Sequence, residues 1–327
     1  MKSKAIAHAN IALVKYWGKR DAALNLPDVG SISITLDRLS TKTEVVFKET
    51  LNKDSLLLNQ KNAAEKEIKR ITEFLDLVRN ASGISYFAEV ISGNNFPTSA
   101  GLASSASAFA ALSLAATRAA GLSYDNKQLS ILSRRGSGSA ARSVYGGFVE
   151  MYKGQKKDGS DAYAQQLADH NYWDIRVLIA ITSVDAKKTG STDGMNLSKL
   201  TSPYYKPWVE SSAKDLNEMR RAIAGKDFEK MAEIAEFSCL KMHALAMATN
   251  PGLIYWNPTT IKLIHEVKTL REQGYPLFFT IDAGPQVKII TLPDYADKIE
   301  NYITQISGVK KIISTKLGGD AELIETD

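Results

Sequence analysis

The segment NFPTSAGLASSASAFAAL, residues 95–112, constrains the fold more than any other stretch of this 327-residue chain. Small hydroxylated residues and Gly101 lead directly into an alanine-rich run, which predicts a helix whose first turn carries little side-chain bulk. A helix N-terminus has unpaired N–H groups and a partial positive charge, so small residues there let an anion come close. We expect a phosphate cradle, with a tightly packed polar helix cap as the alternative reading. The stretch lacks both the Gly-Lys-Ser/Thr phosphate loop and the Gly-x-Gly-x-x-Gly dinucleotide fingerprint.

Alternating and helical hydrophobic patterns are mixed along the whole chain. Strands are predicted over 31–37, 41–47, 86–92, 146–152, 173–182, 276–283, 286–291 and 310–317. Helices are predicted over 62–80, about 104–120, 124–135, 205–223, 227–248, 258–273 and 293–306. Ser123 is the expected cap of the helix that starts at 124. This mixture predicts an α+β fold rather than a regular parallel βαβ series, and the length predicts two lobes, 1–185 and 186–327.

Composition excludes several classes of protein. The net charge of +5 is spread along the chain, whereas a nucleic-acid surface concentrates Lys and Arg. Cys239 is the single cysteine, which excludes an internal disulfide, and its helical surroundings predict a small core residue. The four histidines are scattered, so no metal cage is expected. No stretch is apolar enough to span a bilayer or to form a signal peptide, so we expect a cytoplasmic protein that binds neither membrane nor nucleic acid.

Four motifs then point to one family. The stretch PTSAGLASSASAFAAL (97–112) resembles the phosphate loop of the GHMP kinase superfamily. HANIALVKYWGKRD (8–21), RRGSGSAARSVYGGFVEM (134–151) and FTIDAGPQVKII (279–290) resemble the signatures of mevalonate diphosphate decarboxylases. The resemblance implies a GHMP kinase fold, with a ribosomal-protein-like N-terminal lobe, a ferredoxin-like α+β C-terminal lobe and a cleft between them. It also implies ATP-dependent decarboxylation of mevalonate 5-diphosphate to isopentenyl diphosphate, with Mg²⁺ arriving on ATP, and a homodimer.

The resemblance assigns roles residue by residue. Asp282 lies at the end of a predicted strand and is the expected catalytic carboxylate, acting on the 3-hydroxyl. The alternative is a structural Asp in a turn, whose side chain hydrogen-bonds to its own backbone. Arg142 is expected to bind the substrate carboxylate with two hydrogen bonds and to contact Asp282. Lys19 is expected to be a cation that binds oxygen atoms of the substrate. The expected substrate-binding residues are Asn10, Tyr16, Trp17, Gly18, Lys19, Ser137, Gly138, Ser139, Ala140, Ala141, Arg142 and Ser191. The expected nucleotide-binding residues are Pro97, Ser99, Ala100, Gly101, Leu102, Ala103, Ser104, Ser105, Ser107 and Lys187. For Trp17, core packing of the indole is the better interpretation.

Some positions depart from the family pattern. Val29 and Gly30 stand where the family motif LPxNSSxSxTL has an Asn and a Ser, so the affinity for the nucleotide could differ. Thr192 stands where some relatives carry Arg, so one contact to the diphosphate could be absent or replaced. Alternative functions are decarboxylation of the 5-monophosphate and a mevalonate 3-kinase that stops at phosphorylation. An RNA-binding module is the alternative from another class.

Overall fold

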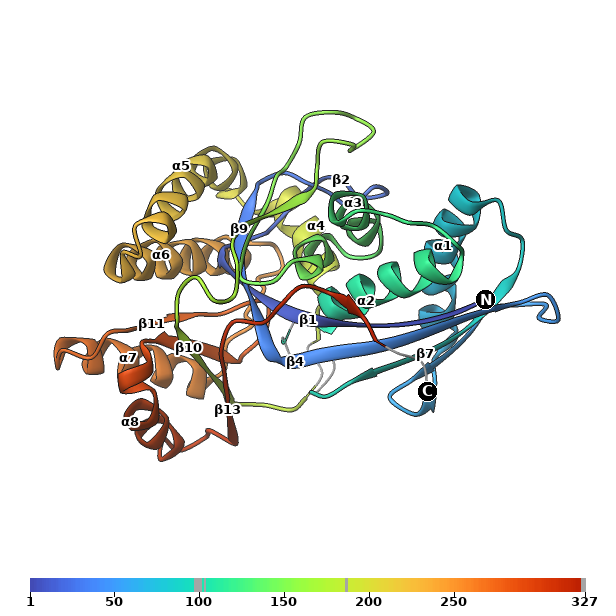
Figure 1. Ribbon diagram of the computed structural model, residues 1–327. Helices are drawn as coiled ribbons and strands as arrows, with labels where there is room; N and C mark the ends of the chain where they lie inside the picture. Colours follow the sequence, from blue (N-terminus) through green and yellow to red (C-terminus); the bar gives the residue numbers. More distant parts are fainter. Residues whose placement is uncertain (97–101, 103, 186–187, 325–327) are drawn as a thin grey trace.

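The computed structural model describes residues 1–96, 102, 104–185 and 188–324, and within them two sheets carry the fold (Figure 1). The larger sheet has the order β14-β1-β4-β7-β5-β6, and β8 and β9 extend it from β4. Its strands are β1 (Lys2–Val14), β4 (Ser31–Lys48), β5 (Ser55–Leu58), β6 (Lys61–Asn62), β7 (Phe87–Asn94), β8 (Phe148–Met151), β9 (Ala164–Ala168) and β14 (Glu322–Leu323). The smaller sheet, in the order β11-β12-β10-β13, comprises β10 (Arg176–Ile181), β11 (Leu277–Thr280), β12 (Val287–Thr291) and β13 (Lys311–Thr315). A short ribbon pairs β2 (Lys19–Asp21) with β3 (Leu26–Pro27).

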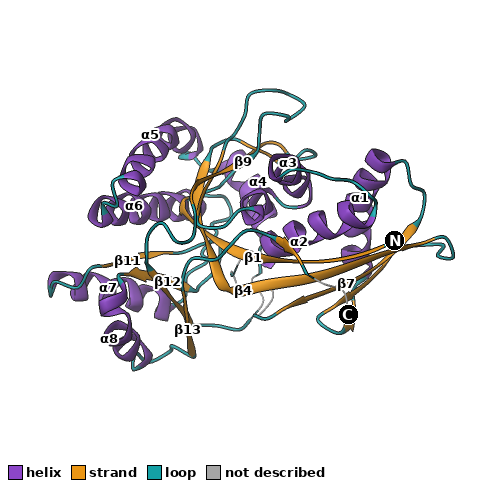
Figure 2. Cartoon of the chain, viewed as in Figure 1, coloured by secondary structure: helices purple, strands orange, loops and turns teal. Residues whose placement is uncertain are grey.

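Helices cover these sheets (Figure 2). On the larger sheet lie α1 (Glu65–Ser82), α2 (Ser104–Ala119), α3 (Asn126–Gly136) and the 3₁₀ helix η1 (Gly138–Val144). The others are α4 (Ser191–Thr201), α5 (Tyr205–Ala224), α6 (Phe228–Met247), α7 (Pro258–Glu272) and α8 (Pro293–Thr304). α2 packs on β1 and β4, while α6 packs on both β1 and β11 and so joins the two sheets. The alanines of α2 favour this close packing, because most of the residues that the helix buries are small.

The core is continuous across both sheets. Leu13 and Ile34 of the larger sheet belong to the same buried cluster as Val177 and Phe278 of the smaller one. The chain passes from the larger sheet to the smaller one between β9 and β10, upstream of residue 185, where the sequence predicts the division between the lobes. The lobe boundary itself stays a prediction. β14 returns to pair with β1, so both ends of the described chain lie at the same end of the long sheet (Figure 1).

Several sequence predictions need correction. The strands predicted over 31–37 and 41–47 are one strand, β4, and its long partner β1 was not predicted. Ser123 does not cap α3: Asp125 does, by accepting a hydrogen bond from Gln128 N at 2.7 Å, while the Gln128 side chain accepts one from Asp125 N. α4 and β9 were missed. The α4 sequence STDGMNLSKLT has weak helix propensity, and contacts from distant residues hold it, such as the hydrogen bond from the Trp17 indole to Ser198 at 2.9 Å.

Candidate active site

A cavity of about 820 Å³ opens where the end of β1, the start of α4 and the loop after β11 meet α1 and the α3–η1 turn. Its charged lining residues are Lys15, Lys19, Lys66, Arg70, Glu73, Arg135, Arg142, Asp193 and Asp282. The structure thus brings together Lys19, Arg142 and Asp282, which lie far apart in the sequence. Six cations against three carboxylates make this recess favourable for an anionic ligand.

Asp282 follows β11 and holds two buried lysines. Its Oδ1 lies 2.7 Å from Lys15 Nζ and its Oδ2 lies 3.2 Å from Lys288 Nζ. Both lysine side chains are 1% exposed, whereas the Asp282 side chain is 24% exposed. Burial alone would raise the pKa of Asp282, but the two ammonium groups more than offset it and hold that pKa well below its ordinary range. The carboxylate is therefore ionised and anchored from beneath.

Arg142 lies on η1 and is almost completely buried. It donates from Nε to Ser33 Oγ (3.0 Å), from Nη1 to Ser31 Oγ (2.5 Å) and from Nη2 to Asn10 Oδ1 (3.0 Å). Among the described residues, these three hydrogen bonds hold the guanidinium in place, and the expected contact with Asp282 is not one of them. Burial lowers the pKa of Arg142 to about 10, and the charge of Asp282 acts in the opposite direction. Arg142 is therefore a charged group held rigidly on the cavity wall.

Asn10 is part of the same arrangement. Its Nδ2 donates to Ser143 Oγ at 2.8 Å and to Ser139 O at 3.0 Å, while its Oδ1 accepts from Arg142. One amide from β1 thus ties the arginine to the α3–η1 turn. Asn10 also lines the cavity, as the family resemblance implies for a substrate-binding residue.

The α3–η1 turn presents two hydroxyls to the cavity. Ser137 Oγ lies 3.3 Å from Ser139 Oγ and 3.2 Å from Ser105 Oγ at the start of α2. Between them, Gly138 leaves room for Tyr16, whose buried hydroxyl would collide with a Cβ at this position. Burial raises the pKa of Tyr16, so the phenol stays protonated.

Other predicted residues of this region lie off the cavity wall. Ala140 and Ala141 pack in apolar clusters, and the lining passes from Ser139 to Arg142. Gly18, which has φ of 103°, lies under Tyr205. The Trp17 indole is buried in a cluster with Trp208, which confirms core packing for this side chain, and Trp17 is also one of the residues that line the cavity.

Lys19 and α4 form one corner of the cavity. Lys19 Nζ donates to Asn25 Oδ1 at 2.6 Å and to Thr192 Oγ1 at 3.4 Å, next to the predicted Ser191. Burial and the charge of Arg70 lower the pKa of Lys19. Lys15, four residues earlier in the chain, makes the ion pair with Asp282.

The start of α2 forms another corner. Leu102, Ser104 and Ser105 line the cavity, whereas Ser107 faces away and pairs with Thr41 Oγ1 at 2.6 Å. Pro97, Ser99, Ala100, Gly101, Ala103 and Lys187 lie outside the described residues. α2 begins at Ser104, so the bare helix entrance predicted from the sequence opens onto the cavity.

A smaller cavity of about 200 Å³ adjoins this corner and shares Arg70, Ser104 and Ser105 with the large one. Most of its other lining side chains are apolar, and one is a carboxylate: the set is Thr43, Leu56, Leu58, Glu67, Ile71, Val90, Ser92, Asn94, Ala108, Phe109 and Leu112. An apolar slot beside an anion-binding helix start has the shape and polarity that a nucleoside requires.

Metal ligands do not gather in this part of the chain. Within the described residues, no three His, Cys, Asp or Glu side chains lie close enough to hold a metal ion. A divalent cation here would be bound mainly by the phosphate oxygens of a ligand. Besides Asp282, the carboxylates on the cavity wall that could contribute to its binding are Glu73 and Asp193.

Comparison with known proteins identifies the family. Residues 7–164 match the diphosphomevalonate decarboxylase-like N-terminal domain, and residues 177–324 match the mevalonate 5-diphosphate decarboxylase C-terminal domain. The chain belongs to the diphosphomevalonate decarboxylase family. It is 36% identical to the diphosphomevalonate decarboxylase of Candida albicans over 95% of each chain. The mevalonate diphosphate decarboxylase of Staphylococcus aureus is 40% identical, with a TM-score of 0.93 over 99% of this chain and 98% of that one. MDDEF in complex with MVAPP, AMPPCP and magnesium is 38% identical, with a TM-score of 0.93 over 100% and 99%.

These likenesses bear out the α+β, two-lobed fold that the resemblance implied. The two departures from the decarboxylase pattern at Val29 and Gly30 lie off the cavity. Val29 is buried in the cluster with Trp17, and a Cβ at Gly30 would come within 2.8 Å of Leu216 on α5. Both positions therefore serve packing between the lobes.

Sequence reasoning missed both of the cations that α1 contributes to the cavity. Lys66, Arg70 and Glu73 have the i, i+4, i+7 spacing that places side chains on one face of a helix, which was a readable signal. Arg70 donates to Gly136 O at 2.8 Å and lies over the Phe109 ring, so this face of α1 is tied to the α3–η1 turn.

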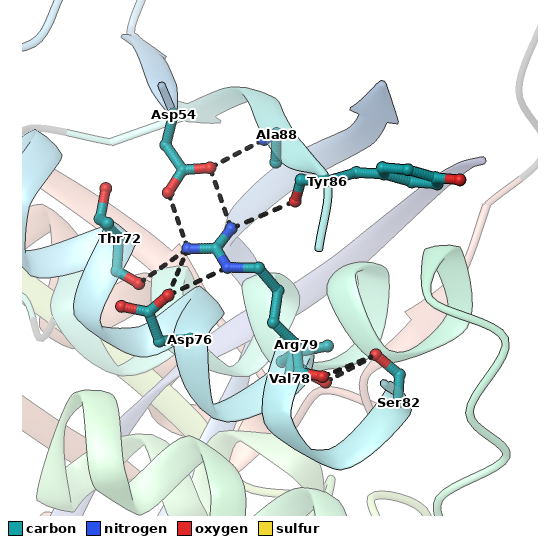
Figure 3. A network of polar contacts seen from close by, with 8 residues as sticks. All are labelled: Asp54, Thr72, Asp76, Val78, Arg79, Ser82, Tyr86 and Ala88. Carbon is teal, nitrogen blue, oxygen red and sulfur yellow. Dashed lines mark hydrogen bonds and ion pairs between the residues drawn. The ribbon is translucent and has the colours of Figure 1, made fainter. Parts of the chain in front are cut away.

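The far end of α1 is anchored by a buried ion pair (Figure 3). Arg79 donates to both oxygens of Asp54, at 3.1 and 3.0 Å, and to Asp76 at 2.7 Å. Asp54 also accepts a hydrogen bond from Ala88 N at 2.7 Å, so β7 joins the same cluster. The helix that carries Lys66 and Arg70 is thereby fixed to the sheet.

Proposed function

We propose that this protein catalyses the ATP-dependent decarboxylation of mevalonate 5-diphosphate, giving isopentenyl diphosphate, ADP, phosphate and CO2. The observation that carries the proposal is the ionised Asp282 at the floor of a cationic cavity, with Arg142 on its wall and the start of α2 at its edge. Family membership supports the same reaction.

The cavity offers a separate partner for each charged part of this substrate. In the proposal, Arg142 and Asn10 bind the C1 carboxylate, because a buried guanidinium forms charge-assisted bonds with carboxylates. The diphosphate is bound by Ser137 and Ser139 and by nearby cations. The set proposed for the diphosphate is Tyr16, Lys19, Arg70, Ser137, Gly138, Ser139 and Ser191.

Asp282 is then left for the 3-hydroxyl. Mevalonate has no carbonyl β to its carboxylate, so loss of CO2 needs a leaving group on C3. Transfer of the γ-phosphoryl group of ATP to the 3-hydroxyl oxygen supplies one: the C3–O bond breaks, phosphate departs, and the electrons of the C–CO2 bond form the alkene. Because two lysines hold its pKa far below the ordinary range, Asp282 is a weak base that accepts a hydrogen bond and orients the hydroxyl for attack.

ATP and Mg²⁺ fit the residues that remain. The nucleotide phosphates are proposed to rest at the start of α2, near Ser104 and Ser105, with the base in the smaller apolar cavity. When bound, Mg²⁺ neutralises phosphate charge as the phosphoryl group moves. The related MDDEF complex contains AMPPCP and magnesium, which supports this assignment.

A product assay tests the proposal. Purified protein is incubated with MgATP and either mevalonate 5-diphosphate or mevalonate 5-phosphate, and isopentenyl diphosphate, ADP and CO2 are measured. We expect all three products from the diphosphate and ADP release that depends on the acceptor. Faster CO2 release from the monophosphate would assign the protein to that substrate instead, and ADP without CO2 would indicate a 3-kinase. Salt-dependent RNA binding without turnover would revive the RNA-binding alternative.

We also propose a cytoplasmic homodimer. No helix in the described part of the chain has the length and apolar character needed to cross a membrane. On α6, Phe237, Leu240 and Met247 form an exposed row of large apolar side chains, the kind of surface that protein contacts cover. Light scattering of the wild type and of a Phe237→Glu variant tests the dimer: a monomeric wild type would contradict it.

A further inference from the structure

Lys288 is a buried cation beneath the cavity. It lies on β12, where every residue from Val287 to Thr291 is buried, and its side chain is 1% exposed. Lys15 and Asp282 line the cavity, whereas Lys288 does not appear on the wall. Its Nζ nevertheless lies 3.2 Å from Asp282 Oδ2. Lys288 thus contacts the carboxylate without lining the cavity, so an effect of Lys288 on the reaction can pass through that carboxylate.

A lysine at this depth is unfavourable unless it is compensated. Removing an ammonium group from water is costly, and burial accordingly lowers the pKa of Lys288 while Asp282 raises it. Cys239 and His243 of α6 face the same region, and burial keeps both uncharged by raising the pKa of Cys239 to about 11 and lowering that of His243 to about 3. Lys15, the residue after β1, and Arg142 on η1 add positive charge. Asp282 is therefore the anion around which these groups are arranged.

We propose that Lys288 is a positioning residue: it holds Asp282 Oδ2 from beneath while Lys15 holds Oδ1, so that the carboxylate stays ionised and keeps one orientation when substrate fills the cavity. This inference rests on the proposed role of Asp282 in the decarboxylation. With one cation at each oxygen, the carboxylate plane cannot rotate without breaking an ion pair. The Asp282 side chain is 24% exposed and lines the cavity, where the 3-hydroxyl is expected.

The first test measures the pairing without using activity. Wild type, K288M, D282N and the double variant D282N/K288M are unfolded in urea at pH 7, and their midpoints are compared. Methionine retains the length of the lysine stem without its charge. We expect K288M to lower the midpoint with Asp282 present, and to lower it less or to raise it in the D282N background. Equal effects in the two backgrounds overturn the proposal. If K288M alone fails to fold, a folded double variant supports the pairing and an unfolded one contradicts it.

The second test measures the catalytic consequence as a pH profile of CO2 release. Without Lys288, the pKa of Asp282 rises, so activity is lost at higher pH than in wild type. We expect an acid limb to appear in the kcat profile of K288M at a pH where wild-type kcat is still constant. We also expect kcat to fall about tenfold while KM for the diphosphate changes less than about twofold, because Lys288 does not touch the ligand. The exposed Lys262→Met on α7 is the matched control and should leave both parameters unchanged.

The two tests separate this inference from the proposed function. An acid limb and kcat unchanged in K288M overturn the positioning role, even where the urea cycle shows coupling, because the pair is then structural only. A wild-type protein that releases no CO2 contradicts the proposed function, and the urea cycle then decides alone whether Lys288 holds Asp282.

Discussion

Replacing Arg142 with lysine removes the geometry of the site while retaining its charge. The guanidinium makes three buried hydrogen bonds, to Ser31, Ser33 and Asn10, in three different directions. The single ammonium of a lysine can reach at most one of these three partners, so two charge-assisted hydrogen bonds are lost. Hydrogen bonds to charged groups contribute about 1.5–3 kcal/mol each; the serine hydroxyls can rotate to other partners, so the lower figure applies. We expect Arg142→Lys to reduce the free energy of unfolding by about 3 kcal/mol.

The effect on activity should be similar in free energy to the effect on folding. At a temperature where the variant is fully folded, we expect kcat for CO2 release to fall about 100-fold, which corresponds to about 2.7 kcal/mol of lost transition-state stabilisation. Urea unfolding gives the first quantity and radiolabelled CO2 release the second. Arg118→Lys, an exposed arginine on α2, is the matched control and should match wild type in both. An R142K protein that unfolds within about 1 kcal/mol of wild type and turns over normally would refute the reasoning.

Three further outcomes follow from the described contacts. Arg79→Met leaves the buried Asp54 carboxylate unpaired, so urea unfolding should show a loss of about 3–5 kcal/mol; a loss below about 1 kcal/mol would contradict the anchoring of α1. Gly138→Ala forces the Tyr16 ring aside, so initial rates should show KM for the diphosphate raised about tenfold with an unchanged circular dichroism spectrum, and an unchanged KM would count against this turn as a binding element. Burial lowers the pKa of His243 from 6.5 to about 3, so the unfolded chain binds a proton that the native state refuses, and wild-type stability falls as pH drops from about 6.5 towards 3. In His243→Asn, the urea midpoint should depend less on pH over that range. An unchanged pH dependence of the midpoint would exclude His243 as the cause of the wild-type loss.

Local sequence predicted much of the site because its residues belong to contiguous motifs. Asp282 stands at a strand end, Ser137 and Ser139 flank a glycine, and Ser104 opens an alanine-rich helix; each pattern indicates its local geometry without long-range information. Cys239 was expected in the core, and the structure confirms that it is buried there.

Residues whose role depends on distant partners were harder to predict. Lys288 lies within β12 and Lys15 directly follows β1, and only the folded chain shows that Asp282 is the anion between them. Arg142 was expected at Asp282, but Ser31 and Asn10 on the sheet take its hydrogen bonds. Periodicity cannot report such pairings, because it describes one element at a time.

The central claim is that Asp282 acts on the reacting hydroxyl and does not merely support the fold. Its most direct test is CO2 release from mevalonate 5-diphosphate labelled at C1, with wild type and Asp282→Asn compared under saturating MgATP. The account predicts that the variant remains folded and binds ATP with an affinity within about twofold of wild type, yet releases CO2 at least about 1000-fold more slowly. Release by the folded variant at a rate close to wild type would contradict it.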